Sequence, residues 1–350
     1  MKLWLKIFLI ISSVISLLCL TACAAGLFSG GYETVVYSPG EGFSDVRLEL
    51  DTADLELRLS EDGKCRVECD ERKRLAYSVG VSDGELLVRL VDGRRWYDHL
   101  NFNFGKGPRV TVYLPEAVLG DLSVECDTGD VRIPAELSFE RIGVRLATGD
   151  VECLARGVGA VEVEATTGNV ALDGTNAAEV SVETTTGNIT VSRLSVGGEL
   201  KLCADTGIIA VAESNALSLD AKTTTGNIAV ADSGFLGEVK IEVTTGDTEL
   251  SRVTAGSLTT RGDTGDVTLA SASISGKMTV ERTTGDVRLA GCDAAEVTIN
   301  TTTGDVEGSF MSDKIIFATS DTGSIDIPRL TSGGRCDIST STGDIRIEIE

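Results

Sequence analysis

The 350-residue chain has few of the side chains on which most active sites depend. Its one histidine, His99, cannot build a histidine-based triad or metal cluster within a single chain. Trp, Tyr and His are absent from residue 119 onward, where the aromatic residues are Phe139, Phe235, Phe310 and Phe317. Sugar-cleaving sites need paired carboxylates in a specific cleft, whereas the acidic residues here are spread evenly. The sequence therefore argues against an enzyme, with a polysaccharide-acting β-helix enzyme kept as the alternative.

The nine cysteines include no CxxC pair and no cluster with histidine, so zinc-binding spacing is absent. Cys65 and Cys69 stand four apart in an alternating segment, about 13 Å along a strand, which is too far for a direct disulfide. Most of the others fall on apolar positions of a repeat and are expected to be small core residues. No cofactor is expected.

Basic residues are also scarce: 31 Lys and Arg stand against 54 Asp and Glu, for a formal net charge of −23. Nucleic acid is excluded as a partner, because affinity for it comes from cationic side chains that neutralise phosphates. An acidic surface keeps a protein soluble and attracts cations, cationic peptides or cationic proteins.

The N-terminus has the pattern of an export signal. Lys2 and Lys6 precede an apolar run that ends in Leu20-Thr21-Ala22-Cys23, which resembles a bacterial lipobox with Cys23 as the lipidated residue. Residues 1–22 are then a signal peptide and 23–31 a tether. The alternative is an uncleaved signal anchor, since the uncharged run up to Tyr32 is long enough to span a bilayer. Both interpretations place the body outside the bacterial cell membrane.

A Thr-Gly turn recurs twelve times at steps of 19 or 20 residues, which is the signature of a stacked repeat architecture. Counting from the glycine, positions −7 and −5 and positions +2 and +4 are apolar in nearly every copy, and Thr248 is the exception at +2. A spacing of two predicts two strands per coil that face one core. The turn glycines are Gly129, Gly149, Gly168, Gly187, Gly207, Gly226, Gly246, Gly265, Gly285, Gly304, Gly323 and Gly343.

We therefore predict an all-β fold, a parallel β-solenoid (β-helix) of about twelve 19–20-residue coils over residues 119–350. An apolar position near +7 predicts a third, shorter face. Residues 32–118 alternate apolar and polar residues without the turn motif and are expected to form an N-terminal β cap region, with Asp51-Thr52-Ala53-Asp54 as a decayed copy. The last segment, 345–349, is expected to form the far edge, which Arg346, Glu348 and Glu350 would guard against aggregation.

The turn residues have a local explanation. Glycine can adopt a positive φ at a tight corner, and the Asp or Asn that follows can hydrogen-bond local backbone. Like charges stacked about 4.8 Å apart repel unless they are paired or bridged by a cation. Turn capping is favoured, and weak cation binding is the alternative for Asp130, Asp150, Asp247, Asp266, Asp286, Asp305 and Asp344.

The one cluster that is both aromatic and basic lies at residues 94–106. Trp and Arg are enriched at binding hot spots, so this segment is the candidate contact loop, and a hairpin covering the end of the core is the alternative. Its residues are Arg94, Arg95, Trp96, Tyr97, His99, Phe102, Phe104 and Lys106.

Three features together resemble a known bacterial family: Arg109-Val110-Thr111-Val112-Tyr113-Leu114-Pro115, then 124–131, then the repeated Thr-Thr-Gly-Asp-Val turns. This is the β-strand-repeat "putative adhesin" family, a domain of unknown function. The resemblance covers about residues 32–350. It implies an extracytoplasmic, membrane-tethered β-solenoid with roles in adhesion or envelope stress, and it supplies no catalytic residues. The expected function is a surface structural or interaction protein, with a cell-envelope component among its partners.

Overall fold

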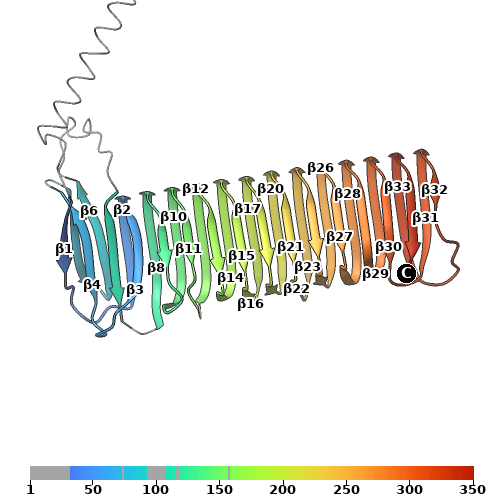
Figure 1. Cartoon of the computed structure of the whole chain (residues 1–350). Coiled ribbons are helices and arrows are strands. Elements are labelled where there is room, and N and C mark those ends of the chain that lie inside the picture. Colours follow the sequence, from blue (N-terminus) through green and yellow to red (C-terminus); the bar gives the residue numbers. More distant parts are fainter. Residues whose placement is uncertain (1–31, 73–74, 93–106, 116–117, 157) are drawn as a thin grey trace, which may run out of the picture.

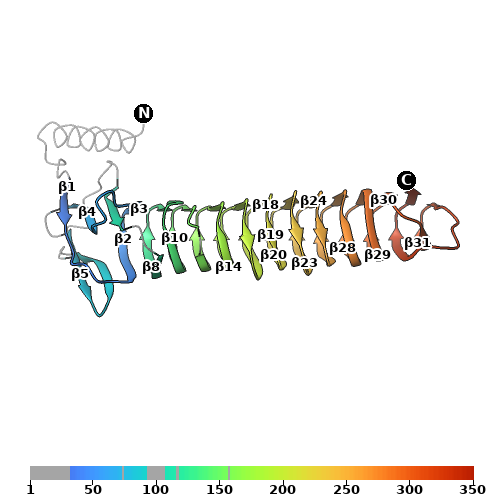
Figure 2. The ribbon, with the colours of Figure 1, turned by 90° about the horizontal axis from the view of Figure 1, so that it is seen from below.

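The computed structural model describes residues 32–72, 75–92, 107–115, 118–156 and 158–350. Strands stack side by side in one row from the blue to the red end of the chain (Figure 1, Figure 2), and the predicted parallel β-solenoid is confirmed. Among the described residues no helix is long and apolar enough to cross a membrane.

Each regular coil contributes one long strand, which ends at the turn threonine. These strands pair in parallel and in register, threonine beside threonine. We call the sheet they form the long-strand sheet. Its regular members are β8 Val118–Thr128, β10 Ser138–Thr148, β12 Val158–Thr167, β14 Asn176–Thr186, β17 Glu199–Thr206, β20 Ser218–Thr225, β23 Glu238–Thr245, β26 Ser257–Thr264, β28 Ser273–Thr284 and β29 Val287–Thr303.

After the glycine turn the chain enters a second parallel sheet, the short-strand sheet, which faces the first across the core. The first residues of β29 belong to it as well. Its other regular members are β9 Val131–Ile133, β11 Val151–Cys153, β13 Val170–Asp173, β15 Ile189–Ser192, β18 Ile209–Ala212, β21 Ile228–Ala231, β24 Thr248–Ser251, β27 Val267–Ala270 and β30 Val306–Phe310.

The predicted third face is present as short strands in the middle coils. They are β16 Ser195–Val196, β19 Asn215–Ala216, β22 Gly234–Phe235 and β25 Thr254–Ala255. The apolar positions of the repeat fill the core, as Leu122, Val124, Val131 and Ile133 do in the first regular coil, each at most 1% exposed. The cysteines follow the same rule, since six of the seven described ones are buried and all seven are free thiols.

Residues 32–118 hold one further coil and a set of antiparallel strands. The strands are β1 Glu33–Tyr37, β2 Asp45–Thr52, β3 Asp54–Leu59, β4 Arg66–Glu71, β5 Leu75–Ser82, β6 Glu85–Asp92 and β7 Arg109–Leu114. Strand β2 pairs with β8 so that Thr52 lies beside Thr128, and β3 pairs with β9. The decayed-copy interpretation is therefore confirmed, and part of the segment expected to be cap is solenoid. Antiparallel pairs β5–β6, β4–β7 and β1–β4 close this end.

The stacking order departs from the chain order at both ends. Strand β2 lies between β8 and β6, although β6 comes between β2 and β8 in the chain. At the other end the chain forms β31 Lys314–Thr322 and β32 Ile325–Asp326, and then returns to place β33 Gly334–Thr342 between β29 and β31. Likewise β34 Ile345–Ile349 lies between β30 and β32. The expectation that 345–349 forms the far edge is wrong, because the preceding coil lies outside it.

The turn glycine meets two requirements at once. At Gly226 φ is +141°, a region that side chains with a Cβ rarely adopt. A Cβ built on Gly226 would also lie 2.0 Å from the carbonyl oxygen of Gly207 in the neighbouring coil. The same close approach recurs from Gly149 to Gly343. Glycine is therefore required both by the local backbone and by the distance between coils.

We predict that Gly226→Ala lowers stability by more than the 1–3 kcal/mol expected of backbone strain alone, because a neighbouring coil must also move. Gly174→Ala separates the two effects, since Gly174 has φ +67° but open space around it. Gly80→Ala, with neither constraint, is the control. Thermal or urea unfolding should rank the losses in the order 226, 174, 80. Equal losses at 226 and 174 would contradict the close-approach argument.

Candidate interaction surfaces

The Asp and Asn residues after the turn glycines form a hydrogen-bonded ladder with one break, at Ile208, whose side chain offers no acceptor to Asn227. The Oδ1 atom of Asp130 accepts a bond of 2.9 Å from the backbone N–H of Asp150, and Asp150 accepts one of 2.7 Å from Asn169. The pattern continues to the far end, where Asp344 accepts from Ser324 at 2.7 Å. The predicted local turn cap is therefore corrected: these side chains bind the backbone of the next coil.

The ladder explains how like charges tolerate the stacking. Each Oδ1 meets an N–H donor, and asparagine serves equally well, as Asn169 does for Asn188 at 3.0 Å. At Asp266 the Arg288 guanidinium donates at 2.7 Å and the Asp286 N–H at 3.0 Å, and these bonds lower the pKa of Asp266. This stabilisation is present above the ordinary aspartate pKa and is lost as the pH falls through the lowered value. No group of three or more His, Cys, Asp or Glu in the described ranges is arranged to hold a metal ion.

Substitution at one rung separates the ladder from cation binding. We expect Asp130→Asn to leave stability nearly unchanged, because the amide oxygen remains an acceptor, and Asp130→Ala to cost about 0.5–1.5 kcal/mol. Unfolding midpoints with calcium and with a chelator provide the check. A calcium-dependent stabilisation of the wild type that Asp130→Asn reduces would instead support the cation site.

A buried arginine, Arg282 in strand β28, interrupts the apolar core. Arg282 occupies position −3, points inward and is 4% exposed. Its Nη2 donates to Thr248 Oγ1 at 2.5 Å, whereas Nε and Nη1 have no hydrogen-bond partner within the described residues. Gly262 in the intervening coil provides the space for the guanidinium, since a Cβ at that position would lie 1.7 Å from Nη1. Desolvation lowers the pKa of Arg282, opposed by Asp247 and Asp263.

A buried charge with incomplete partners can be replaced by apolar groups without loss of stability. We expect Thr248→Val alone to cost about 1–3 kcal/mol, since it removes the one bond Arg282 makes to a side chain. The double variant Arg282→Met with Thr248→Val should be at least as stable as the wild type. A double-mutant cycle from urea unfolding measures this coupling; a double variant less stable than Thr248→Val would contradict the argument.

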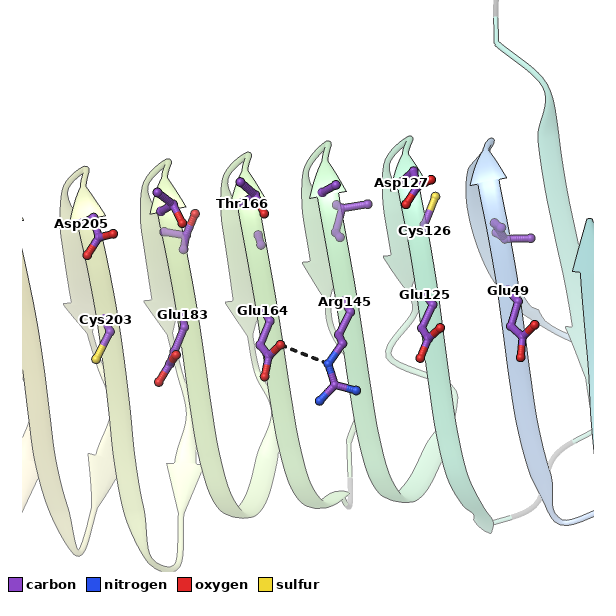
Figure 3. A pocket seen from close by; sticks show the side chains of 16 residues that line it. Glu49, Glu125, Cys126, Asp127, Arg145, Glu164, Thr166, Glu183, Cys203 and Asp205 are labelled. Atoms are coloured by element: carbon purple, nitrogen blue, oxygen red, sulfur yellow. Dashed lines mark hydrogen bonds and ion pairs between the residues drawn. The ribbon is translucent and has the colours of Figure 1, made fainter. Parts of the chain in front are cut away.

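The outer face of the long-strand sheet carries an acidic groove of about 700 Å³ near the N-terminal end of the stack. Its side chains come from successive coils at position −4, and Figure 3 shows Glu49, Glu125, Arg145, Glu164 and Glu183 in a row along the stack. Asp127 and Asp205 line its upper rim, so six acidic side chains face one basic side chain.

Ion pairs neutralise only part of this charge. Arg145 Nε lies 3.0 Å from Glu164, Lys201 Nζ lies 2.5 Å from Glu183, and Glu49 receives a 2.5 Å bond from Arg89, which lowers the pKa of Glu49. None of these basic side chains pairs with Glu125, whose carboxylate has no ion pair with a described residue. The groove is therefore an open, net acidic surface on a rigid sheet. Sequence reasoning recognised these positions as water-facing, and aligning the −4 column would have revealed the row.

The residues from 43 to 350 match a known family model in two overlapping segments, 43–207 and 203–350, described as Toastrack DUF4097. The two matches together cover most of the chain. This protein belongs to the Toastrack DUF4097 family. The resemblance to a β-strand-repeat family of unknown function is thereby confirmed.

Solved structures similar to this Toastrack protein come from Bacteroides and Parabacteroides species. A "putative adhesin" from Bacteroides fragilis is 16% identical, with 91% of this chain and 98% of that chain covered and a TM-score of 0.29. A "putative adhesin" from Parabacteroides distasonis is 12% identical, with 89% and 98% covered and a TM-score of 0.33. A "putative lipid binding protein" from the same species is 10% identical, with 91% and 98% covered and a TM-score of 0.23. No curated protein matches the chain.

Two sets of sites predicted for this Toastrack protein lie outside the described residues. They are the lipidation site Cys23 and the candidate contact loop over residues 94–106. Both remain predictions. The strands on either side of that loop, β6 and β7, belong to the two sheets at the cap end.

Proposed function

We propose that this protein is an extracytoplasmic, membrane-tethered interaction protein of the adhesin-like kind, which binds a cationic peptide or protein segment in the acidic groove. The observation that carries the proposal is the groove itself, where six acidic side chains and one basic side chain line an open channel on a rigid sheet. The tether is the N-terminal segment, attached through lipidated Cys23 or through an uncleaved anchor.

Electrostatic and geometric arguments support a cationic occupant. Carboxylates repeated at the strand spacing of about 4.8 Å create a negative potential along the stack. Such a surface accelerates the approach of a cationic segment and rejects anionic ones. Glu125 and Glu183 lie on coils separated by two others, so the groove suits an extended ligand that lies along the stack.

A binding role also suits the chemistry of the described residues better than the alternative enzyme. The groove is open and its acids lie on a regular sheet face, whereas glycoside cleavage needs two carboxylates with distinct roles around one bond. The groove contains neither histidine nor an aromatic ring. Turnover of cell-wall glycans by the purified protein would instead support the alternative that it is an enzyme.

The groove is tested with a fluorescent nonalysine peptide and the full chain in mild detergent. We expect Glu125→Gln with Glu164→Gln to weaken binding about three- to tenfold, with less salt dependence, because each exposed charge contributes up to about 1 kcal/mol.

The matched control is Glu242→Gln with Glu281→Gln. These residues occupy the same −4 column on coils outside the groove, and both are ion-paired, Glu242 with Lys240 at 2.9 Å and Glu281 with Arg261 at 2.8 Å. The control should bind like the wild type. If both double variants lose the same affinity, the peptide responds only to net charge and the groove is not a site.

A further inference from the structure

The coil at the far end lacks the strand neighbour that covers every other coil, and the segment between β32 and β33 extends past it (Figure 1, Figure 2). Strand β31 pairs only with β33, and β32 only with β34, so their outer edges have no partner among the described residues. Ile325 at position +2 is 43% exposed, whereas Ile345 at the same position of the neighbouring coil is 1% exposed. Ile316 and Ala318, which belong to buried columns, are only partly buried.

The sequence of this edge differs from the repeat in a way that the core does not require. Position −6 faces outward, and in every other coil it holds a polar residue or glycine. Phe317 is the exception and is 55% exposed, resting beside the Arg335 guanidinium at 5.3 Å. Position −8 departs from the repeat in the same way, because it holds Ile315 here and no large apolar residue in the other coils. The full −6 column reads Arg47, Ser123, Gly143, Glu162, Ser181, Lys201, Asp220, Lys240, Thr259, Thr279, Thr298, Asp337 and Phe317.

Natural sheets protect their edges with charges, proline, bulges or very short strands. The edge strand β31 has nine residues, about 30 Å of backbone, and from Ile315 to Ser320 it contains neither charge nor proline. The cap end, in contrast, is closed by antiparallel strands. An unprotected edge with apolar residues on both faces is the arrangement that accepts another strand.

We infer that the β31 edge binds a second copy of this chain, tail to tail, about a twofold axis near Ala318. An antiparallel β31 pair with Ala318 opposite its counterpart joins the two long-strand sheets. Phe317 then lies opposite Thr319 of the second copy. The two Asp321 side chains stand about 20 Å apart, so the charged end of the strand does not oppose itself.

The same end of the molecule is farthest from the predicted tether. Tyr32, the first described residue, adjoins β1 at the cap end, opposite β31 (Figure 1). If the chain is tethered as proposed above, tail-to-tail pairing joins chains that stand on two facing surfaces. This part of the inference rests on the proposed function, whereas the pairing itself does not.

The test compares the full chain, purified in mild detergent, with Phe317→Lys. Lysine occupies the same column at Lys201 and Lys240, so the fold should accept it. We expect a concentration-dependent dimer by sedimentation, with a dissociation constant raised at least about tenfold in the variant. Thr279→Lys, in the same column inside the stack, should dimerise like the wild type. A monomer at every concentration, or equal weakening by both substitutions, would overturn the pairing.

Orientation is read from gold bound to a tag inserted in the predicted tether, after residue 31, in negative-stain images. Gold at both outer ends of a doubled rod supports tail-to-tail pairing, and gold at the junction overturns it. Nonalysine binding, measured on the same samples, separates the two proposals. A dimer that does not bind the peptide rejects the groove alone, whereas a monomer that binds the peptide rejects only the pairing.

Discussion

The close contact between successive turn glycines is the constraint on which the rest of the molecule depends. Because the carbonyl oxygen of one turn occupies the space where the Cβ of the next would be, the coils approach closely enough for both sheets to pair in register. Register then places every apolar position over its counterpart, which fills the core, and every Asp or Asn beside the next backbone N–H, which binds the corner. The threonine at position −3 adds to this, as Thr223 does by donating to the Gly207 carbonyl at 3.2 Å.

A strictly periodic fold also makes its exceptions informative. Arg282, Gly262 and Thr248 depart from their columns on three successive coils, and the structure shows that they are one local arrangement. Phe317 departs from its column on the coil that has no outer neighbour. The two surfaces proposed for binding follow the same rule. The acidic groove is a run of acidic residues in the −4 column, and the β31 edge is marked by Phe317, which breaks the −6 column. In a solenoid, function is therefore sought in the residues that the stacking does not explain.

Much of this architecture could be predicted from the sequence. The period predicted the solenoid, the spacing of two predicted the opposed strands, and Thr52-Ala53 indicated a coil before the first regular turn. The Asp row was recognised but assigned to local backbone, because sequence spacing does not distinguish a bond within a turn from one to the next turn. The order of the end coils could not be predicted either, since coils of nearly equal sequence can stack in any order. The groove depends on acidic residues that share one outward position on neighbouring coils. The sequence contains this information, but it becomes visible only when the coils are aligned with one another.

The return of the chain at the far end has a mechanical consequence. In a sequentially stacked solenoid, tension on the last residue peels the final strand from one neighbour at a time. Here β33 and β34 are each hydrogen-bonded on both sides, so a pull on Glu350 must break two ladders together. The outermost coil is in turn a closed loop of chain whose two ends both enter the stack. Neither β34 nor the outermost coil therefore offers a place where unzipping can start.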